Sequence, residues 1–317
     1  MTGSICAGSN PRITAAVCAY NAAAFLPDCI TSLMDQCIAH DEYEVLLIDN
    51  NSTDDTNAII RAAQRRYGVR LRLFTEREQG LSAARNCALT HAKSPVVAYV
   101  DADAVADTGW LAAILACIDE FPRSAVVGGR IEVQWDSPKP RWWDDRLDEA
   151  MGRFSPRSDQ GMLKYPGYPY GGNFAVRTEA ARELGGFCRG LGRKGAKLMA
   201  GEEGELCLRL ERQGWTIHYT PHALIHHRAT ADRLTRPYIL RRAFHHGRAQ
   251  YRLEANHDFE SGLYASPVGL LRGVILNTLR RNLKMPYFKH LFFRVGYHYE
   301  RLAKKLRRHA RADSDSP

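Results

Sequence analysis

The chain lacks the features that define several large classes of protein. None of the uninterrupted apolar runs in its 317 residues approaches the length of about 18 residues that a membrane-spanning helix needs. The segment from Met1 to Pro11 has neither the basic start nor the apolar stretch of a secretory signal. We therefore expect a cytoplasmic protein, with residues 1–10 as a flexible N-terminus.

Cysteine pairs and nucleophile motifs are also missing. The eight cysteines include no C-x-x-C pair, so we expect reduced thiols and no zinc site. No G-x-S-x-G occurs, and no G-x-G-x-x-G follows the first strand-like segment. These absences disfavour a covalent hydrolase and a dinucleotide-dependent dehydrogenase.

Acidic residues are scarce in the last quarter of the chain. Residues 233–311 carry 18 Lys and Arg against four Asp and Glu, a net charge of +14, whereas residues 1–232 have a net charge of −3. A basic region of this kind binds polyanions, either nucleic acid or an anionic membrane surface. We expect residues 233–311 to form a basic helical C-terminal extension and residues 312–317 to form a tail.

The first half of the chain alternates strand and helix patterns. Short apolar runs, typical of strands, cover residues 13–19, 43–48, 69–74 and 95–100. Helical periodicity covers residues 25–37, 53–67, 81–92 and 110–121. Strands separated by single helices predict an α/β fold with a mostly parallel sheet. Further along, a helix is expected from 202 to 213 and a last strand at 215–219.

Acidic loops follow two of the predicted strands. One loop runs from Asp49 to Thr56, and the other is Asp101-Ala102-Asp103. In such sheets ligands bind beyond the carboxyl ends of the strands, so the loops are expected to converge on one site. A D-x-D pair can hold a divalent cation against a diphosphate. A helix N-cap and a solvated turn are the alternative interpretations of the two loops.

Seven segments together resemble the inverting, nucleotide-sugar-dependent glycosyltransferases of family 2. They are VCAYN (17–21), YEVLLIDNNSTDDT (43–56), GLSAARNCAL (80–89), YVDAD (99–103), GGNFAVRTEAARELGGF (171–187), GEEGELCLRL (201–210) and YTPHALIHH (219–227). The resemblance covers residues 11–232, in the family's order. It implies the GT-A fold, a Rossmann-like αβα sandwich with a nucleotide-binding half at 11–103 and an acceptor half at 104–232.

The resemblance also implies a set of site residues. The nucleotide and donor sugar would be bound by Ala19, Asn21, Asp49, Arg85, Asp101, Gly172 and Asn173. Mn²⁺ or Mg²⁺ would be held by Asp101, Asp103 and His227, with His222 and His226 as competing histidines. Glu202 and Glu203 stand where the family has its Glu-Asp pair, whose second acid is the usual catalytic base. Either acid remains a candidate, with Glu203 the closer match.

The implied reaction moves a sugar from a UDP-sugar or another nucleotide sugar to an acceptor hydroxyl, with inversion and metal assistance. The base takes the hydroxyl proton, and the metal stabilises the departing diphosphate. We expect a glycan or lipid-linked acceptor, in cell-surface polysaccharide or exopolysaccharide assembly. Glycosylation of a small natural product is the alternative. A catalytically silent nucleotide-sugar-binding or nucleic-acid-binding protein is the alternative from another class, although the chain has no zinc, RRM or KH signature and no nucleic acid is expected.

Two cationic segments carry further hypotheses. Residues 192–203 place three cations before Glu203, which predicts either a solvated loop or a mobile lid over a diphosphate; these are Arg193, Lys194 and Lys197.

In the basic region, apolar residues recur at helical spacing, at positions 288, 291, 292, 295, 299, 302 and 306. We expect residues 237–309 to dock on an anionic membrane at its inner face. Packing of this stripe on the catalytic domain is the alternative. A second apolar stretch, 268–283, is broken by arginines and would not span a bilayer.

Overall fold

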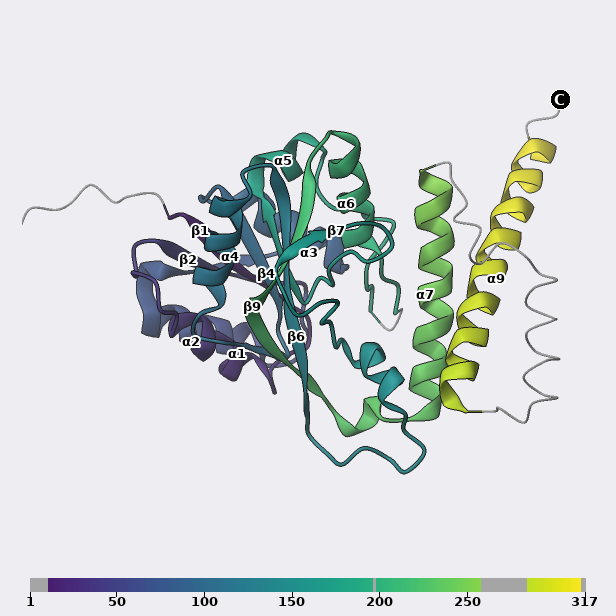
Figure 1. Ribbon diagram of the computed structural model, residues 1–317, viewed down its shortest axis with the longest axis horizontal. Helices are drawn as coiled ribbons and strands as arrows, with labels where there is room; N and C mark the ends of the chain where they lie inside the picture. Colours follow the sequence, from purple (N-terminus) through teal and green to yellow (C-terminus); the bar gives the residue numbers. More distant parts are fainter. Residues whose placement is uncertain (1–10, 196–197, 258–283, 315–317) are drawn as a thin grey trace, which may run out of the picture. The chain divides into compact units, whose positions relative to one another are not determined.

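The computed structural model describes residues 11–195, 198–257 and 284–314 (Figure 1). The chain divides into two compact units. The sheet unit comprises Met1–Gln134, Gly152–Arg189 and Glu203–Arg228, and the helical unit comprises Trp135–Met151, Gly190–Glu202 and Ala229–Pro317. The expectations for residues 1–10, 268–283 and Lys197 lie outside the described residues.

A single mixed sheet forms the centre of the sheet unit. Its strands are β1 (Ile13–Ala19), β2 (Tyr43–Asp49), β3 (Leu71–Thr75), β4 (Val96–Asp101), β5 (Ala104–Ala106), β6 (Ser124–Trp135), β7 (Gly161–Leu163), β8 (Asn173–Arg177) and β9 (Thr216–Ala229). They lie in the order β3-β2-β1-β4-β8-β6-β9-β5, and β7 pairs with β9.

The predicted α/β class is confirmed, and four neighbouring strands of the sheet pair in parallel. Strands β3, β2, β1 and β4 pair in parallel, whereas β8 pairs antiparallel with β4 and β6, and β9 pairs antiparallel with β5 and β7. Parallel neighbours need a crossover connection, usually a helix. A helix of the sheet unit precedes each of β2, β3 and β4. These helices provide the crossovers that the four parallel strands need.

The helices of the sheet unit lie where helical periodicity was predicted, except α5, for which no helix was predicted. They are α1 (Leu26–Met34), α2 (Thr56–Tyr67), α3 (Leu81–His91), α4 (Trp110–Glu120), α5 (Thr178–Glu183) and α6 (Glu202–Arg212), whose first residue belongs to the helical unit. All seven residues of β2 are buried, as expected for a strand covered on both faces. The apolar strands and the inner faces of the helices form one continuous core.

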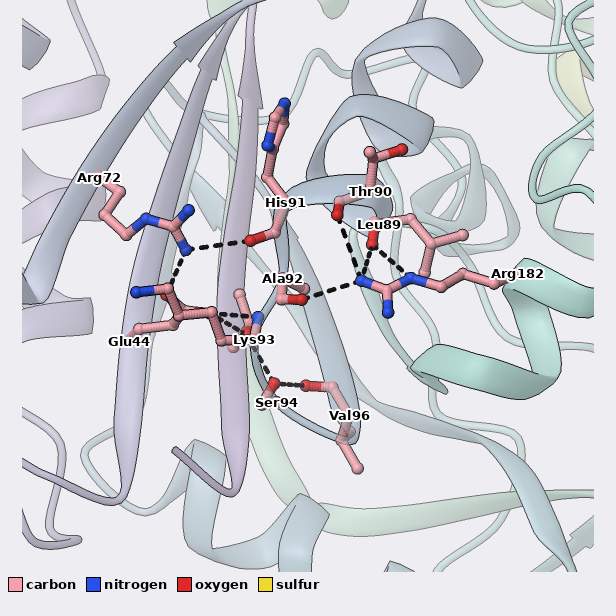
Figure 2. Close-up of polar contacts among 11 residues, drawn as sticks. Glu44, Arg72, Leu89, Thr90, His91, Ala92, Lys93, Ser94, Val96 and Arg182 are labelled. Atoms are coloured by element: carbon pink, nitrogen blue, oxygen red, sulfur yellow. Dashed lines mark hydrogen bonds and ion pairs between the residues drawn. The ribbon is translucent and has the colours of Figure 1, made fainter. Parts of the chain in front are cut away.

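A polar network closes the amino-terminal end of the parallel strands (Figure 2). The carboxylate of Glu44, on β2, accepts hydrogen bonds from Arg72 Nη1 at 2.8 Å and from the backbone N–H of Lys93 at 2.8 Å. Thr14, on β1, donates to the same carboxylate at 2.9 Å. Arg182, on α5, donates to three carbonyl oxygens at the end of α3. The polar groups at this end of the sheet therefore form hydrogen bonds with one another.

The helical unit contains two long helices, α7 (Arg236–Asn256) and α9 (Met285–Ser314), and two short 3₁₀ turns at Asp145–Met151 and Ala231–Arg233. Both long helices lie in the predicted helical region, except that α9 continues three residues past 311 into the predicted tail. None of the described helices is long and apolar enough to cross a membrane.

Candidate active site

Three predicted metal ligands meet where β4 ends. Asp101 is the last residue of β4, and Asp103 immediately precedes β5. The antiparallel pairing of β5 with β9 sets Ala104 opposite His227. One ligand atom from each of Asp101, Asp103 and His227 lies within 4.8 Å of the other two. Strand pairing therefore brings a histidine from late in the sequence onto the D-x-D turn.

The donor set of this cluster fits a divalent cation. Two carboxylates and an imidazole suit Mn²⁺, and carboxylates also suit Mg²⁺. His227 is buried and directs Nε2 toward Asp103, with Nε2 and Oδ1 3.3 Å apart. Gly152 lies beside the other face of the ring, since a Cβ there would come 3.4 Å from Nδ1. The imidazole of His227 is therefore closely packed, and its Nε2 faces the carboxylate of Asp103.

The competing histidines do not join the cluster. Among the described residues the group that could hold a metal contains His227 and neither His222 nor His226. Successive residues of a strand point to opposite faces, so His226 turns away when His227 turns inward. His222 is an odd number of residues from His227 on the same strand and is exposed.

Two successive glycines lie between the metal-ligand cluster and a second acidic group. A Cβ on Gly172 would lie 2.8 Å from Asp101 Oδ2. A Cβ on Gly171 would overlap both Glu203 Oε1 and Arg85 Nη2. A side chain at either position would therefore displace these polar groups. Because the two glycines are adjacent, the D-x-D cluster and Glu203 lie close together in the sheet unit.

Glu203 forms a buried ion pair with Arg85. Nη1 of Arg85, on α3, donates to Oε1 of Glu203, on α6, at 2.7 Å. The side chains are only 3% and 13% exposed. The guanidinium also lies over the rings of Tyr99 and Phe187, 5.8 and 5.4 Å from their centroids. Among the described residues, Arg85 provides the only hydrogen bond to the Glu203 carboxylate, and it reaches Oε1.

The sequence names both partners of this pair but not the contact. The resemblance predicts Arg85 among the residues that bind the nucleotide and donor sugar, and the structure buries its side chain. The two residues are 118 positions apart, and no local pattern indicates that they pair. Glu202 is also buried but belongs to the helical unit, whereas Glu203 belongs to the sheet unit and forms the ion pair with Arg85.

Asp49 is buried at the end of β2, where its carboxylate organises the loop that follows. Oδ1 accepts from the backbone N–H of Ser52 at 3.1 Å, and Oδ2 accepts from Nδ2 of Asn57 at 2.9 Å. Both oxygens retain lone pairs, so a further donor from a ligand is compatible with these bonds.

The turn after β1 is tied to the same loop. Asn21 has a positive φ of 49° and accepts a hydrogen bond from the N–H of Thr53 at 2.8 Å. Ala19 is buried and its carbonyl accepts from the N–H of Asn50 at 2.8 Å. Hydrogen bonds therefore join the ends of the first two strands into one polar rim. Ala19, Asn21 and Asp49, which were predicted to bind the nucleotide and donor sugar, lie on this rim.

The side chain of Asn173, a predicted donor-binding residue, forms hydrogen bonds within the fold. Its side chain is buried and accepts from Nε1 of Trp110 at 2.8 Å. It also donates to the carbonyl oxygens of Arg130 and Ala223 at 2.9 and 2.7 Å. The amide is thus occupied in joining α4, β6 and β9, and we leave it out of the proposed binding residues.

The cations predicted to form a lid belong to the helical unit. Burial alone would raise the pKa of Tyr238, but the charges of Arg242, Arg193 and Arg233 outweigh it and lower that pKa. Arg193 is therefore close to α7. Trp142 and Trp143 lie in the same unit. Nε1 of Trp143 donates to Oδ1 of Asp148 at 2.9 Å, and the guanidinium of Arg236 lies over the ring of Trp142.

Comparisons with known proteins identify the family of the chain. The model of the glycosyl transferase family 2 matches residues 14–185. Glucosyl-dolichyl phosphate glucuronosyltransferase of Haloferax volcanii is 25% identical over 173 residues, which are 54% of this chain and 55% of that protein. Succinoglycan biosynthesis protein ExoM of Rhizobium meliloti is 25% identical over 215 residues, 67% of this chain and 65% of that protein. The chain thus spans about half to two thirds of the length of these relatives.

The solved structures show the same fold. The mannosyltransferase PcManGT of Pyrobaculum calidifontis, solved in complex with GDP-Man and Mn²⁺, superposes with a TM-score of 0.66 at 20% identity, over 94% of this chain and 88% of that one. The α/β architecture is that of the GT-A fold. Because the family model covers more than half of the chain, the protein belongs to glycosyltransferase family 2.

Proposed function

We propose that the protein transfers a sugar from a nucleotide-sugar donor to an acceptor hydroxyl, with inversion at the anomeric carbon and with the help of a divalent cation. One observation carries this proposal. Asp101 of the metal-ligand cluster and the Glu203 carboxylate lie against two adjacent glycines, so the candidate cation ligands and the base candidate are close together. The mannosyltransferase of the same fold holds GDP-Man and Mn²⁺, which supports both the donor class and the metal.

The cation site would act on the leaving group. The carboxylates of Asp101 and Asp103 and Nε2 of His227 are the residues that would hold Mn²⁺ or Mg²⁺. When bound, the cation would stabilise the negative charge that develops on the departing nucleoside diphosphate. Asp49 and the rim at Ala19 and Asn21 would accept hydrogen bonds from the nucleoside.

Glu203 would act on the acceptor. Its carboxylate takes the proton from the acceptor hydroxyl as that oxygen forms a bond to the anomeric carbon, and the bond from that carbon to the diphosphate oxygen breaks. Arg85 binds Oε1, which fixes the orientation of the carboxylate and leaves Oε2 as the proton acceptor. The arginine also offsets the cost of burying the carboxylate charge.

The relatives suggest the setting of the reaction. ExoM is named for succinoglycan biosynthesis, and the name of the Haloferax protein describes an acceptor carried on a dolichyl phosphate. We propose a glycan or lipid-linked acceptor in the assembly of a cell-surface polysaccharide or exopolysaccharide. We also propose that the protein works as a peripheral protein at the inner face of the cell membrane.

A transfer assay tests the proposal. The purified chain is incubated with a panel of UDP- and GDP-sugars and either Mn²⁺ or Mg²⁺, and a thermal-shift screen first selects the donor. A ligand at about 100 times its dissociation constant stabilises the folded state by about 2.7 kcal/mol, which gives a readable shift. The expected product has the opposite anomeric configuration to the donor by NMR, and excess chelator stops its formation. A product with retained configuration, or full activity in chelator, would overturn the proposal.

A further inference from the structure

Large apolar side chains are exposed along one face of α9. Five of the nine exposed large hydrophobic residues in the described part of the chain lie on this helix: Phe292, Val295, Tyr299, Leu302 and Leu306. Their exposure rises along the helix from 36% to 63%. They are spaced alternately by three and four residues, which places them on one face. We call these five residues the apolar stripe.

Close packing against α7 fixes the rotation of α9. A Cβ on Gly247 of α7 would overlap the carbonyl oxygen of Phe293, and a Cβ on Gly296 of α9 would overlap the carbonyl oxygen of Phe244. The two backbones therefore approach closely at both glycines. Turning the apolar stripe toward α7 would move Gly296 out of this contact and bring a larger side chain into it.

Buried polar contacts fix the same rotation. Tyr297 donates its hydroxyl to Glu254 at 2.6 Å. Glu300 is 2% exposed and accepts hydrogen bonds from Arg248 at 2.7 Å and Arg252 at 3.0 Å. Burial alone would raise the pKa of Glu300, but these arginines outweigh it and lower that pKa, so the residue stays charged at neutral pH. The face of α9 toward α7 thus carries Gly296, Tyr297 and Glu300. Tyr299 lies at the edge of this contact, with its ring 5.6 Å from that of Phe244 on α7, and the rest of the apolar stripe is exposed.

The exposed part of α9 is also strongly basic. Up to residue 307 the helix carries six Lys and Arg and one acid, the buried Glu300. One basic row runs beside the apolar stripe at intervals of seven and four residues; it consists of Arg294, Arg301 and Lys305. An exposed apolar face flanked by cations is the pattern of a helix that lies in the plane of a membrane interface.

We propose that the apolar stripe of α9 docks on an anionic lipid bilayer, with the stripe among the acyl chains and the basic row at the headgroups. The stripe spans about 21 Å along the helix axis, from the rise of 1.5 Å per residue. Phe292 and Tyr299 supply the aromatic rings that favour the interface. A second copy of the chain fits this face less well, because pairing two such helices would bring their basic rows together without acids between them.

Vesicle flotation of the full chain tests this surface. The vesicles contain phosphatidylcholine alone or phosphatidylcholine mixed with phosphatidylglycerol, at low and at high salt. The double variant Leu302→Glu with Leu306→Glu replaces two exposed residues, so the fold should be kept. We expect the wild type to float with the anionic vesicles at low salt, to float less at high salt, and to partition at least about tenfold more strongly than the double variant.

Val69→Glu is the matched control, because Val69 is 95% exposed and lies in the sheet unit. This variant makes the same kind of change elsewhere and should float like the wild type. Equal binding of wild type and double variant would overturn the proposal, and so would equal binding to neutral and anionic vesicles. Sedimentation velocity without lipid is measured in parallel. A wild-type dimer that the double variant dissociates would assign the stripe to a second copy and would also overturn it.

Discussion

The two ends of the parallel strands carry the same kind of ion pair in different surroundings. At the amino-terminal end, Arg72 binds the carboxylate of Glu44 at 2.8 Å (Figure 2). At the other end, near the last residue of β4, Arg85 binds the carboxylate of Glu203 at 2.7 Å. Both carboxylates are largely buried, so burial and charge pairing alone do not tell a structural acid from a catalytic one.

The neighbours of each carboxylate make the difference. Glu44 receives a hydroxyl and a backbone N–H in addition to its arginine, so its bonds are made within the fold. Among the described residues Glu203 receives a hydrogen bond from its arginine alone, and its other close neighbour is Gly171, which contributes no side chain. A carboxylate with one oxygen held and the other available is suited to accept a proton from a substrate.

The largest expected effect comes from Glu203→Gln. The amide keeps the size of the side chain and a hydrogen bond to Arg85, but it cannot take up the acceptor proton. We expect kcat to fall by about 10²–10⁴ while donor affinity is nearly retained. Transfer kinetics and donor titration measure the two quantities separately. If Glu202→Gln were inactive and Glu203→Gln fully active, the base would be the neighbouring acid.

Gly171→Ala is expected to have an intermediate effect. The new methyl group overlaps Glu203 Oε1 and Arg85 Nη2, so the pair must move apart. We expect kcat to fall about tenfold or more and the free energy of unfolding to fall by about 1–3 kcal/mol. The matched control is Gly109→Ala, since a Cβ at Gly109 meets nothing within 4 Å. Full activity of Gly171→Ala would show that the position of the pair does not matter for catalysis.

Glu44→Gln should have the smallest effect on activity. It leaves Arg72 with a neutral partner and weakens three hydrogen bonds at the structural end of the sheet. We expect a loss of about 1–3 kcal/mol in the free energy of unfolding, measured by denaturant titration, with kcat unchanged. A large loss of kcat at full stability would remove the distinction between the two ends.

Local pattern predicts most of the elements of the sheet unit. The apolar run at 13–19 coincides with β1, and the helix predicted at 81–92 differs from α3 by one residue. The strand predicted at 215–219 instead runs from Thr216 to Ala229. Its second half pairs with β5, a partner distant in sequence. Single-sequence periodicity contains no information about such a partner.

The candidate site was predictable residue by residue but not as an arrangement. The motifs name Asp101, Asp103 and His227, and the β5–β9 register explains why they meet. The pairing of Arg85 with Glu203 could not be predicted, because it depends on how α3 and α6 lie in space. Asn173 stands in a motif that suggests a ligand contact, yet the buried Trp110 and two carbonyls occupy its amide.

Metal binding at the carboxyl end of the sheet is the most direct test. Mn²⁺ is titrated into the protein with a saturating nucleoside diphosphate, and bound Mn²⁺ is followed by electron paramagnetic resonance. We expect saturable Mn²⁺ binding by the wild type and by Glu44→Gln. In Asp103→Asn the side chain has lost its negative charge, and we expect Mn²⁺ to bind about 10–100-fold more weakly. Equal binding of Mn²⁺ by Asp103→Asn and the wild type would contradict a catalytic metal site at Asp101, Asp103 and His227.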